Sequence, residues 1–176
     1  MPTNLELKAK VSNLTDAERI ARKIGAKKDS VLIQTDIYFN LASGRLKLRE
    51  INSRKFELIH YARANRPGDR YSNYTIVPLR EPHTVKKVLT KLFGQKVVVR
   101  KRRLLYLFNN ARIHLDLVMG LGFFIEFEVL VTKGKAQAES FMRTLRKEFS
   151  LLPSQIVAGS YSDLLFQKRK RRKRAK

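Results

Sequence analysis

The sequence predicts an α+β fold dominated by strands, in which about eight strands form an antiparallel barrel with flanking helices. Two observations lead to this prediction. Stretches of alternating polar and apolar residues recur along the whole chain, whereas helical patterns are few. Each expected strand also pairs an apolar face with a densely charged face. Because the apolar faces can pack on the helices and on one another, we expect the charged faces to line the interior.

The chain begins with an expected strand followed by a helix. Residues 4–11 alternate, so that Glu6 and Lys8 share a face with Asn4. The run 15–18 has the pattern of a capping box, with Thr at the helix N-cap and Glu three residues later. The apolar spacing that follows predicts a helix ending at Gly25.

The middle of the chain is expected to hold most of the strands. Alternation predicts them over residues 34–39, 44–51, 55–63 and 73–78. Residues 64–70 are rich in turn-forming side chains and predict a mobile loop. Thr84 is expected to cap a helix that ends at Gly94. The longest expected strand, over 97–108, places Lys101 and Arg103 on one face.

Residues 112–131 have the pattern of a β-hairpin that turns at Gly120 and Gly122. Both strands are expected to present polar side chains to one place: Arg112, His114, Asp116, Glu126 and Glu128. A histidine with no second histidine beside it is more typical of a structural residue than of a ligand, so His114 is interpreted as structural.

The C-terminal part predicts a helix over 137–149 and a short helix that is capped by Ser160 to Asp163 and ends at Leu165. We therefore expect one domain over residues 1–166 and a basic, disordered tail over 167–176. The sequence contains no repeat and no internal linker.

Charge is the most unusual property of the composition. The chain has 38 Lys and Arg against 15 Asp and Glu, for a net charge of +23. The tail contributes Lys168, Arg169, Lys170, Arg171, Arg172, Lys173, Arg174 and Lys176, but the rest of the chain is strongly basic without them. Such a chain is expected to bind a polyanion: a nucleic acid, an anionic membrane surface or a multiply phosphorylated small molecule.

Several classes of protein are excluded or disfavoured. With no cysteine, the chain has no disulfide, thiolate metal site or cysteine nucleophile. No segment approaches the length of a transmembrane span, and no secretory signal is visible. We expect an intracellular protein, either cytoplasmic or directed to the nucleus by residues 168–176. The same tail is also open to interpretation as a nucleic-acid arm, a solubilising end or an anionic-surface tether.

Acids and bases lining the same cavity suggest a particular ligand. Divalent cations such as Mg²⁺ or Mn²⁺ bind carboxylates and phosphates together, and Lys and Arg bind the remaining phosphate oxygens. A metal-bound triphosphate therefore satisfies both signs of charge.

The sequence resembles the CYTH superfamily of triphosphate tunnel metalloenzymes over about residues 3–166. The family signature Glu-x-Glu-x-Lys corresponds to residues 4–8, and the hairpin motif to 112–116, 120–122 and 126–128. Further matches lie at 34–39, 44–49, 58–63, 99–103 and 160–165. Residues 61–82 are most similar to the class IV adenylyl cyclase-like branch. Order and spacing together make the resemblance specific.

The resemblance implies a closed eight-stranded barrel that holds a triphosphate and Mg²⁺ or Mn²⁺ in its tunnel. The residues that fall on the family's metal-binding acids are Glu6, Glu126 and Glu128, and Asp116 falls on a further catalytic carboxylate. Those that fall on phosphate-binding bases are Lys8, Arg49, Lys101 and Arg103, with Lys47, Arg63 and Arg112 as additions. Asn4 departs from the pattern because it replaces the first Glu and brings an amide oxygen without charge.

Three functions stay open at this stage. The first is metal-dependent hydrolysis of an inorganic or organic triphosphate, such as tripolyphosphate, ATP or thiamine triphosphate. The second is a class IV adenylyl cyclase that converts ATP to cAMP and pyrophosphate. The third is a catalytically decayed module that binds a polyanion or nucleic acid, which Asn4 and the tail favour and the clustered acids disfavour. The sequence does not distinguish a monomer from a homodimer.

Overall fold

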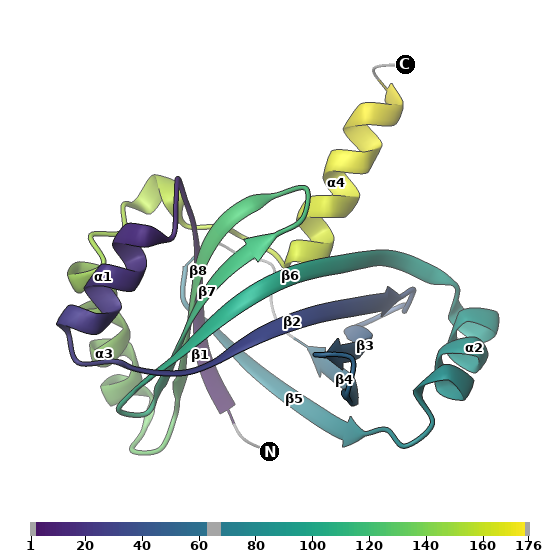
Figure 1. Ribbon diagram of the computed structural model, residues 1–176, viewed down its shortest axis with the longest axis horizontal. Coiled ribbons are helices and arrows are strands. Elements are labelled where there is room, and N and C mark those ends of the chain that lie inside the picture. Colours follow the sequence, from purple (N-terminus) through teal and green to yellow (C-terminus); the bar gives the residue numbers. More distant parts are fainter. Residues whose placement is uncertain (1–2, 63–67, 175–176) are drawn as a thin grey trace.

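The computed structural model describes residues 3–62 and 68–174 (Figure 1). Within these residues the strands are Thr3–Val11 (β1), Lys27–Phe39 (β2), Arg45–Ile51 (β3), Lys55–Ala62 (β4), Arg70–Pro78 (β5), Gln95–Phe108 (β6), Ala111–Val118 (β7) and Gly122–Leu130 (β8). The helices are Thr15–Lys23 (α1), Pro82–Phe93 (α2), Lys135–Glu148 (α3), Tyr161–Arg174 (α4) and the 3₁₀ turn Pro153–Gln155 (η1).

All the strands join in one closed barrel. Their order around the barrel is β1-β5-β4-β3-β2-β6-β7-β8, and every neighbouring pair is antiparallel. The predicted strand-dominated barrel with flanking helices is therefore confirmed. The β7–β8 hairpin is also confirmed, and β6 is the longest strand, as predicted.

The outer surface of β1, β7 and β8 is apolar and is covered by helices. Leu7, Ile113 and Phe127 are fully buried in one core cluster with Met142 and Leu145 of α3. Figure 1 shows α1 and α3 on this side of the barrel, with α2 at the opposite end of the long strands. Because alternate residues of a strand point to opposite faces, burying these apolar side chains outside turns the charged ones inward.

Some element boundaries differ from the predictions. β2 begins at Lys27 rather than at residue 34, because its pairing with β6 extends the strand through residues that alternate poorly. α1 is preceded by Leu14 and has no side-chain cap, so the predicted capping box does not form. α2 begins at Pro82, a residue suited to a first helical turn, and Thr84 lies inside the helix rather than at its cap. The described part of β4 ends at Ala62, and Arg63 lies outside the described residues, together with residues 64–67 of the predicted loop.

The final helix is longer than predicted. Its capping box is confirmed: the Asp163 backbone N–H donates to the Ser160 hydroxyl over 3.2 Å, and the Ser160 backbone N–H donates to the Asp163 carboxylate over 2.9 Å. α4 then continues through Arg174 and projects away from the barrel, where a disordered tail was predicted (Figure 1). Lys and Arg are good helix formers and no Gly or Pro interrupts them, so helical structure continues through the basic run.

Among the described residues, no helix has the length and apolar character needed to cross a membrane.

Candidate functional site

The inner faces of the strands enclose a cavity of about 370 Å³. Every strand contributes to its lining. The charged residues that line it are Glu6, Lys8, Asp36, Lys47, Arg49, Lys55, Glu57, Lys101, Arg103, Arg112, Glu126 and Glu128. Seven bases and five acids therefore line the described walls, so both signs of charge share one cavity, as expected from the sequence.

The structure brings almost all of the predicted site residues together. Those that line the cavity are Glu6, Lys8, Lys47, Arg49, Lys101, Arg103, Arg112, Glu126 and Glu128. Asp116 is fully buried and contacts the lining residues Arg103 and Lys101. Arg63 lies outside the described residues, so its predicted place in the site is not described.

Asp116 holds two of the predicted phosphate-binding bases. It lies directly across from Arg103 in the β6–β7 pairing and accepts a forked pair of hydrogen bonds from it, at 2.7 and 2.6 Å. Lys101 Nζ is 3.5 Å from the same carboxylate. Burial alone would raise the pKa of Asp116, but the charges of Arg103 and Lys101 hold it well below its usual range. Asp116 is therefore ionised.

A second forked pair lies on the neighbouring strands β3 and β2, and β2 pairs directly with β6. Asp36 accepts hydrogen bonds from Arg49 at 2.7 and 3.0 Å and from Lys47 at 3.0 Å. Burial, followed by repulsion from Arg49, lowers the pKa of Lys47 to about 7. Asp36 was not among the predicted site residues. The alternation of Gln34, Asp36 and Tyr38 with apolar neighbours was the signal that could have identified it.

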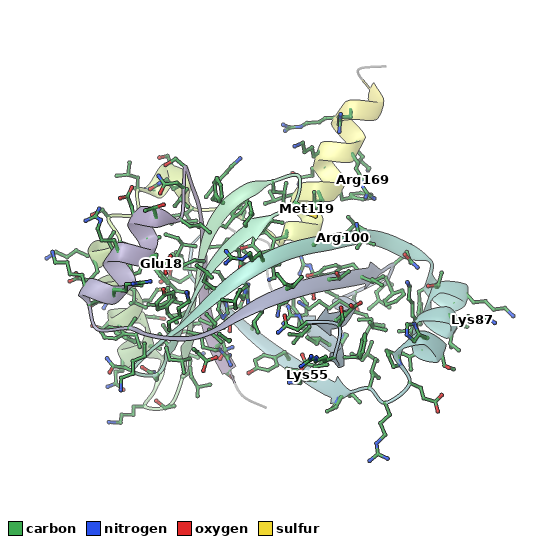
Figure 2. The ribbon with its side chains drawn as sticks, viewed as in Figure 1. Glu18, Lys55, Lys87, Arg100, Met119 and Arg169 are labelled. Atoms are coloured by element: carbon green, nitrogen blue, oxygen red, sulfur yellow. The ribbon has the colours of Figure 1, made fainter. Side chains whose placement is uncertain are left out.

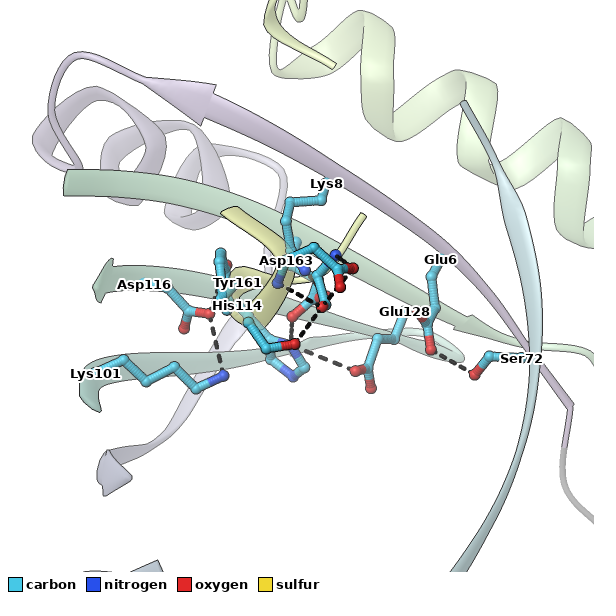
Figure 3. Close-up of polar contacts among 12 residues, drawn as sticks. Glu6, Lys8, Ser72, Lys101, His114, Asp116, Glu128, Tyr161 and Asp163 are labelled. Atoms are coloured by element: carbon cyan, nitrogen blue, oxygen red, sulfur yellow. Dashed lines mark hydrogen bonds and ion pairs between the residues drawn. The ribbon is translucent and has the colours of Figure 1, made fainter. Parts of the chain in front are cut away.

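The bases of the cavity wall share carboxylates with one another. Arg103 also donates a hydrogen bond to one oxygen of Glu126 over 2.7 Å, and Lys8 donates to the other oxygen over 2.7 Å. Figure 3 shows the polar contacts around Lys8. Burial, with repulsion from Arg103, lowers the pKa of Lys101 to about 8. A ligand with several negative charges would relieve the crowding of like charges that depresses the pKa values of Lys47 and Lys101.

Glu126, Glu128 and His114 form a compact cluster. One ligand atom from each lies within 4.8 Å of the others, and His114 Nδ1 is 3.6 Å from Glu126 and 3.8 Å from Glu128. Burial and the charge of Arg103 lower the pKa of His114, which favours the neutral imidazole. A neutral imidazole beside two carboxylates is a donor set that suits a divalent cation.

Among the described residues, three buried side-chain atoms that line the cavity have no hydrogen-bond partner: Nδ1 of His114, Oδ1 of Asn4 and Oε1 of Gln34. Buried polar atoms are nearly always paired, so these atoms indicate room for a cation or another polar group. The donor set therefore fits the metal that the sequence predicted, but His114 takes a place that was not assigned to it.

Glu6 lies differently from the other predicted ligands. Its carboxylate accepts a hydrogen bond of 2.6 Å from Ser72 of β5, and Figure 3 shows it turned toward Ser72. Glu6 faces Glu128 in the β1–β8 pairing, yet it is not part of the compact three-residue cluster. The three predicted metal ligands, Glu6, Glu126 and Glu128, therefore line one cavity, but Glu6 lies outside the cluster that the other two form with His114.

Residues 2–160 match the model of the CYTH domain family. The chain belongs to the CYTH domain family. The resemblance seen in the sequence is therefore confirmed, over all eight strands of the barrel. No curated protein sequence matches this CYTH chain.

Solved structures share the CYTH fold with this chain. The PH1012 protein of Pyrococcus horikoshii has 24% identity and a TM-score of 0.83, covering 92% of this chain and 98% of that one. A candidate adenylate cyclase from Vibrio parahaemolyticus has 19% identity and a TM-score of 0.73, covering 92% and 97%. A candidate adenylyl cyclase from Hippeastrum, described as having a dominant triphosphatase activity, has 13% identity and a TM-score of 0.68, covering 96% of each chain. At these identities the likeness establishes the fold.

The start of α4 closes part of the CYTH tunnel. Tyr161 lines the cavity and donates its hydroxyl proton to Asp116 over 2.9 Å, while Lys8 Nζ lies 4.0 Å from the centre of its ring. Ser160 lines the cavity beside it. The sequence assigned these residues to a helix cap and to one of the family motifs but gave them no place in the cavity, because periodicity shows that a helix begins but not that its first turn enters a barrel.

Proposed function

We propose that this CYTH protein is a divalent-metal-dependent enzyme that hydrolyses an inorganic or organic triphosphate. The observation that carries the proposal is the cavity of the closed barrel. Arginine and lysine side chains line it, and the cluster of His114, Glu126 and Glu128 lies among them. The relatives described as adenylate cyclase and triphosphatase support the same class of substrate.

The mixed charge of the tunnel supports a metal-bound triphosphate over a bare polyanion. Carboxylates on the walls would repel a nucleic-acid backbone, whereas a metal ion bridges carboxylates and phosphate oxygens. Arg49 and Arg103 each present a planar fork that matches two phosphate oxygens. Lys8, Lys47 and Lys101 add point charges between them. On binding, these bases exchange carboxylate partners for phosphate oxygens.

Glu126, Glu128, His114 and the Asn4 amide oxygen are the residues that would hold the metal. A bound Mg²⁺ or Mn²⁺ would polarise a phosphoryl oxygen and neutralise charge that develops on the leaving group. The protein itself contributes position: strands fix the bases, and the closed barrel limits the water that reaches the phosphorus atom. In hydrolysis the water oxygen bonds to phosphorus, the bridging P–O bond breaks and the water proton is released.

Product identification tests this proposal. Purified protein is incubated with tripolyphosphate, ATP or thiamine triphosphate and Mn²⁺ or Mg²⁺, and the products are separated by chromatography. We expect release of orthophosphate or pyrophosphate that stops when the metal is chelated. Formation of cAMP and pyrophosphate from ATP would identify a cyclase instead. Binding of tripolyphosphate with no turnover of any of the three substrates would support the decayed-module alternative.

Protons should be taken up when tripolyphosphate binds at pH 8. The pKa of Lys47 is about 7 in the free protein, so most of its side chains are neutral amines at that pH. A bound polyanion raises this pKa, and Lys47 then takes a proton. The contribution of Lys47 to affinity is therefore complete below its free pKa and is lost as the pH rises from the free toward the bound pKa value.

Calorimetry at pH 8 in two buffers with different heats of ionisation measures this uptake. Lys47→Arg provides the control because arginine stays charged in both states. Uptake should fall in the variant but not vanish, since the pKa of Lys101 is also lowered, to about 8. Equal uptake in both proteins would contradict the place of Lys47 on the bound triphosphate.

Replacing Asn4 with Glu should tighten Mn²⁺ binding by restoring a carboxylate at a buried position. Asn4 is 2% exposed, and its amide oxygen has no partner among the described residues. Attraction between a carboxylate and a cation is stronger in such a site than in water. Calorimetry with Mn²⁺ and no substrate measures the effect, with Asn4→Gln as the uncharged control. Affinities that agree within twofold in all three proteins would remove Asn4 from the metal site.

A further inference from the structure

The projecting end of α4 is separate from the CYTH tunnel. The family match ends at residue 160, so all of α4 lies beyond it. Figure 1 shows the helix extending away from the barrel, and Figure 2 shows Arg169 on the projecting part. We name residues 167–174 the basic arm. The reaction that we propose for the tunnel gives the basic arm no role.

The barrel holds the first turn of α4 firmly. The Tyr161 hydroxyl donates a hydrogen bond to buried Asp116. Asp163 forms an ion pair with Arg45 of β3 over 2.9 Å, and it also caps the helix by accepting a hydrogen bond from Ser160. Farther along the helix, Phe166 lies 5.4 Å from Lys96 of β6 and 5.0 Å from Lys170, measured from each Nζ to the ring centre. The direction of the arm is therefore set by the barrel.

The arm carries uncompensated positive charge. Residues 168–174 are all Lys or Arg, and the side chains of residues 168–172 are exposed. Within the described part of the chain, none of residues 168–172 forms an ion pair with a carboxylate; Lys168 donates instead to the Gly120 carbonyl over 2.6 Å. Like charges three and four residues apart on a helix repel each other. A partner with closely spaced negative charges would remove that repulsion.

The distribution of charge around the helix identifies the kind of partner. Five consecutive bases extend over more than one turn, so every side of the helix is basic. No apolar residue occurs between residues 167 and 174, so the arm has no apolar face to bury in a membrane. A flat acidic surface would contact one side only. A groove with phosphates on both walls contacts several sides at once.

We propose that the basic arm binds double-stranded DNA in the major groove through its phosphates, without reading the base sequence. The major groove of B-form DNA is about 12 Å wide and admits an α-helix. Duplex RNA is less suitable because its major groove is deep and narrow. The proposal does not depend on turnover in the tunnel.

Two triple variants with the same reduction in charge test the proposal. Arg169→Gln, Arg171→Gln and Arg172→Gln remove three exposed bases from the arm. Lys86→Gln, Lys87→Gln and Lys91→Gln remove three exposed bases from α2, which lies at another end of the molecule (Figure 2 labels Lys87). Fluorescence anisotropy of the full chain is measured with two unrelated 20-base-pair DNA duplexes between 50 and 200 mM salt.

We expect the arm variant to bind both duplexes roughly tenfold or more weakly than the natural chain at 50 mM salt. The slope of log affinity against log salt should fall in magnitude by up to about 2.7, at about 0.9 for each phosphate that the variant no longer neutralises. The α2 variant should stay within twofold. Equal weakening in the two variants would show that only total charge matters, and would overturn the proposal. Tighter binding to duplex RNA or to phosphatidylserine vesicles than to DNA would also overturn it.

Discussion

Glu128→Gln should lower the rate of triphosphate turnover by at least about a thousandfold, which corresponds to about 4 kcal/mol in the activation barrier. The amide keeps the size of the side chain but removes a charged ligand from the His114, Glu126 and Glu128 cluster. The fold should survive, because Glu128 lies at the side of the cavity and its partner Arg112 is half-exposed. Steady-state kinetics with Mn²⁺ and the substrate identified by chromatography measures the decrease.

Glu57→Gln is the matched control for this variant. Glu57 is another carboxylate that lines the cavity, but its ion pair of 2.7 Å is with exposed Lys55, and it lies outside the His114 cluster. We expect the control to lose no more than about tenfold in rate, or about 1.4 kcal/mol. Calorimetry should show weakened Mn²⁺ binding for Glu128→Gln and unchanged binding for Glu57→Gln. Activity of Glu128→Gln within a few-fold of the natural chain would refute its place at the metal.

The sequence was sufficient to predict the barrel because its signal is local and repeated. Alternation of polar and apolar residues fixes which side chains share a face, and that rule placed Glu126 with Glu128 and Lys101 with Arg103 correctly. Alternation does not show which strands are neighbours in the barrel. Pairing of β1 with both β5 and β8 joins segments far apart in the chain, and the family resemblance rather than the strand patterns implied that closure.

The parts of the site that the sequence did not reveal depend on pairing across strands. Asp36 acts on Lys47 and Arg49 because β2 and β3 place them opposite one another. Tyr161 reaches Asp116 because the first turn of α4 enters the barrel. Alternation could place Asp36 on the inner face of its strand but not opposite Arg49, and no periodic signal places Tyr161 in the barrel. The end of α4 was misjudged for a different reason: a run of bases is typical of disordered tails, yet each residue also favours a helix.

Buried pairs of carboxylates and bases belong to both the fold and the site. Burial lowers the pKa of the tunnel lysines, and the carboxylates beside them oppose that shift: Asp36 does this for Lys47, and Asp116 for Lys101. The same carboxylates form ion pairs with Arg49 and Arg103, which stay charged. These carboxylates therefore fix the position of the bases that we propose to bind phosphate, and removing one of them would leave a buried base without its partner.

Asp116→Ala should lower the free energy of unfolding by about 3 kcal/mol, because it removes one partner from a buried, forked ion pair. Asp116 is 0% exposed and accepts hydrogen bonds from Arg103 and Tyr161. Arg103 keeps one bond of 2.7 Å to Glu126, which limits the destabilisation. Urea unfolding followed by circular dichroism measures the difference. Asp16→Ala is the control: its partner Arg19 is exposed on α1, so we expect no change in the urea midpoint.

The same carboxylate should make stability depend on acid pH. The pKa of Asp116 is held well below its unfolded value of about 3.9 by Arg103 and Lys101, against the opposing effect of burial. Its contribution to stability is therefore complete above the unfolded pKa and is lost as the pH falls from there toward the folded pKa. Unfolding of the natural chain at pH 7 and at pH 3 should show a difference that is smaller in Asp116→Ala. Two results would contradict this prediction: an equal pH dependence in both proteins, or an Asp116→Ala variant whose free energy of unfolding at pH 7 differs by less than about 1 kcal/mol from that of the natural chain. Either result would mean that the Asp116–Arg103 pair contributes little to the stability of the barrel, and that Arg103 is positioned chiefly by Glu126.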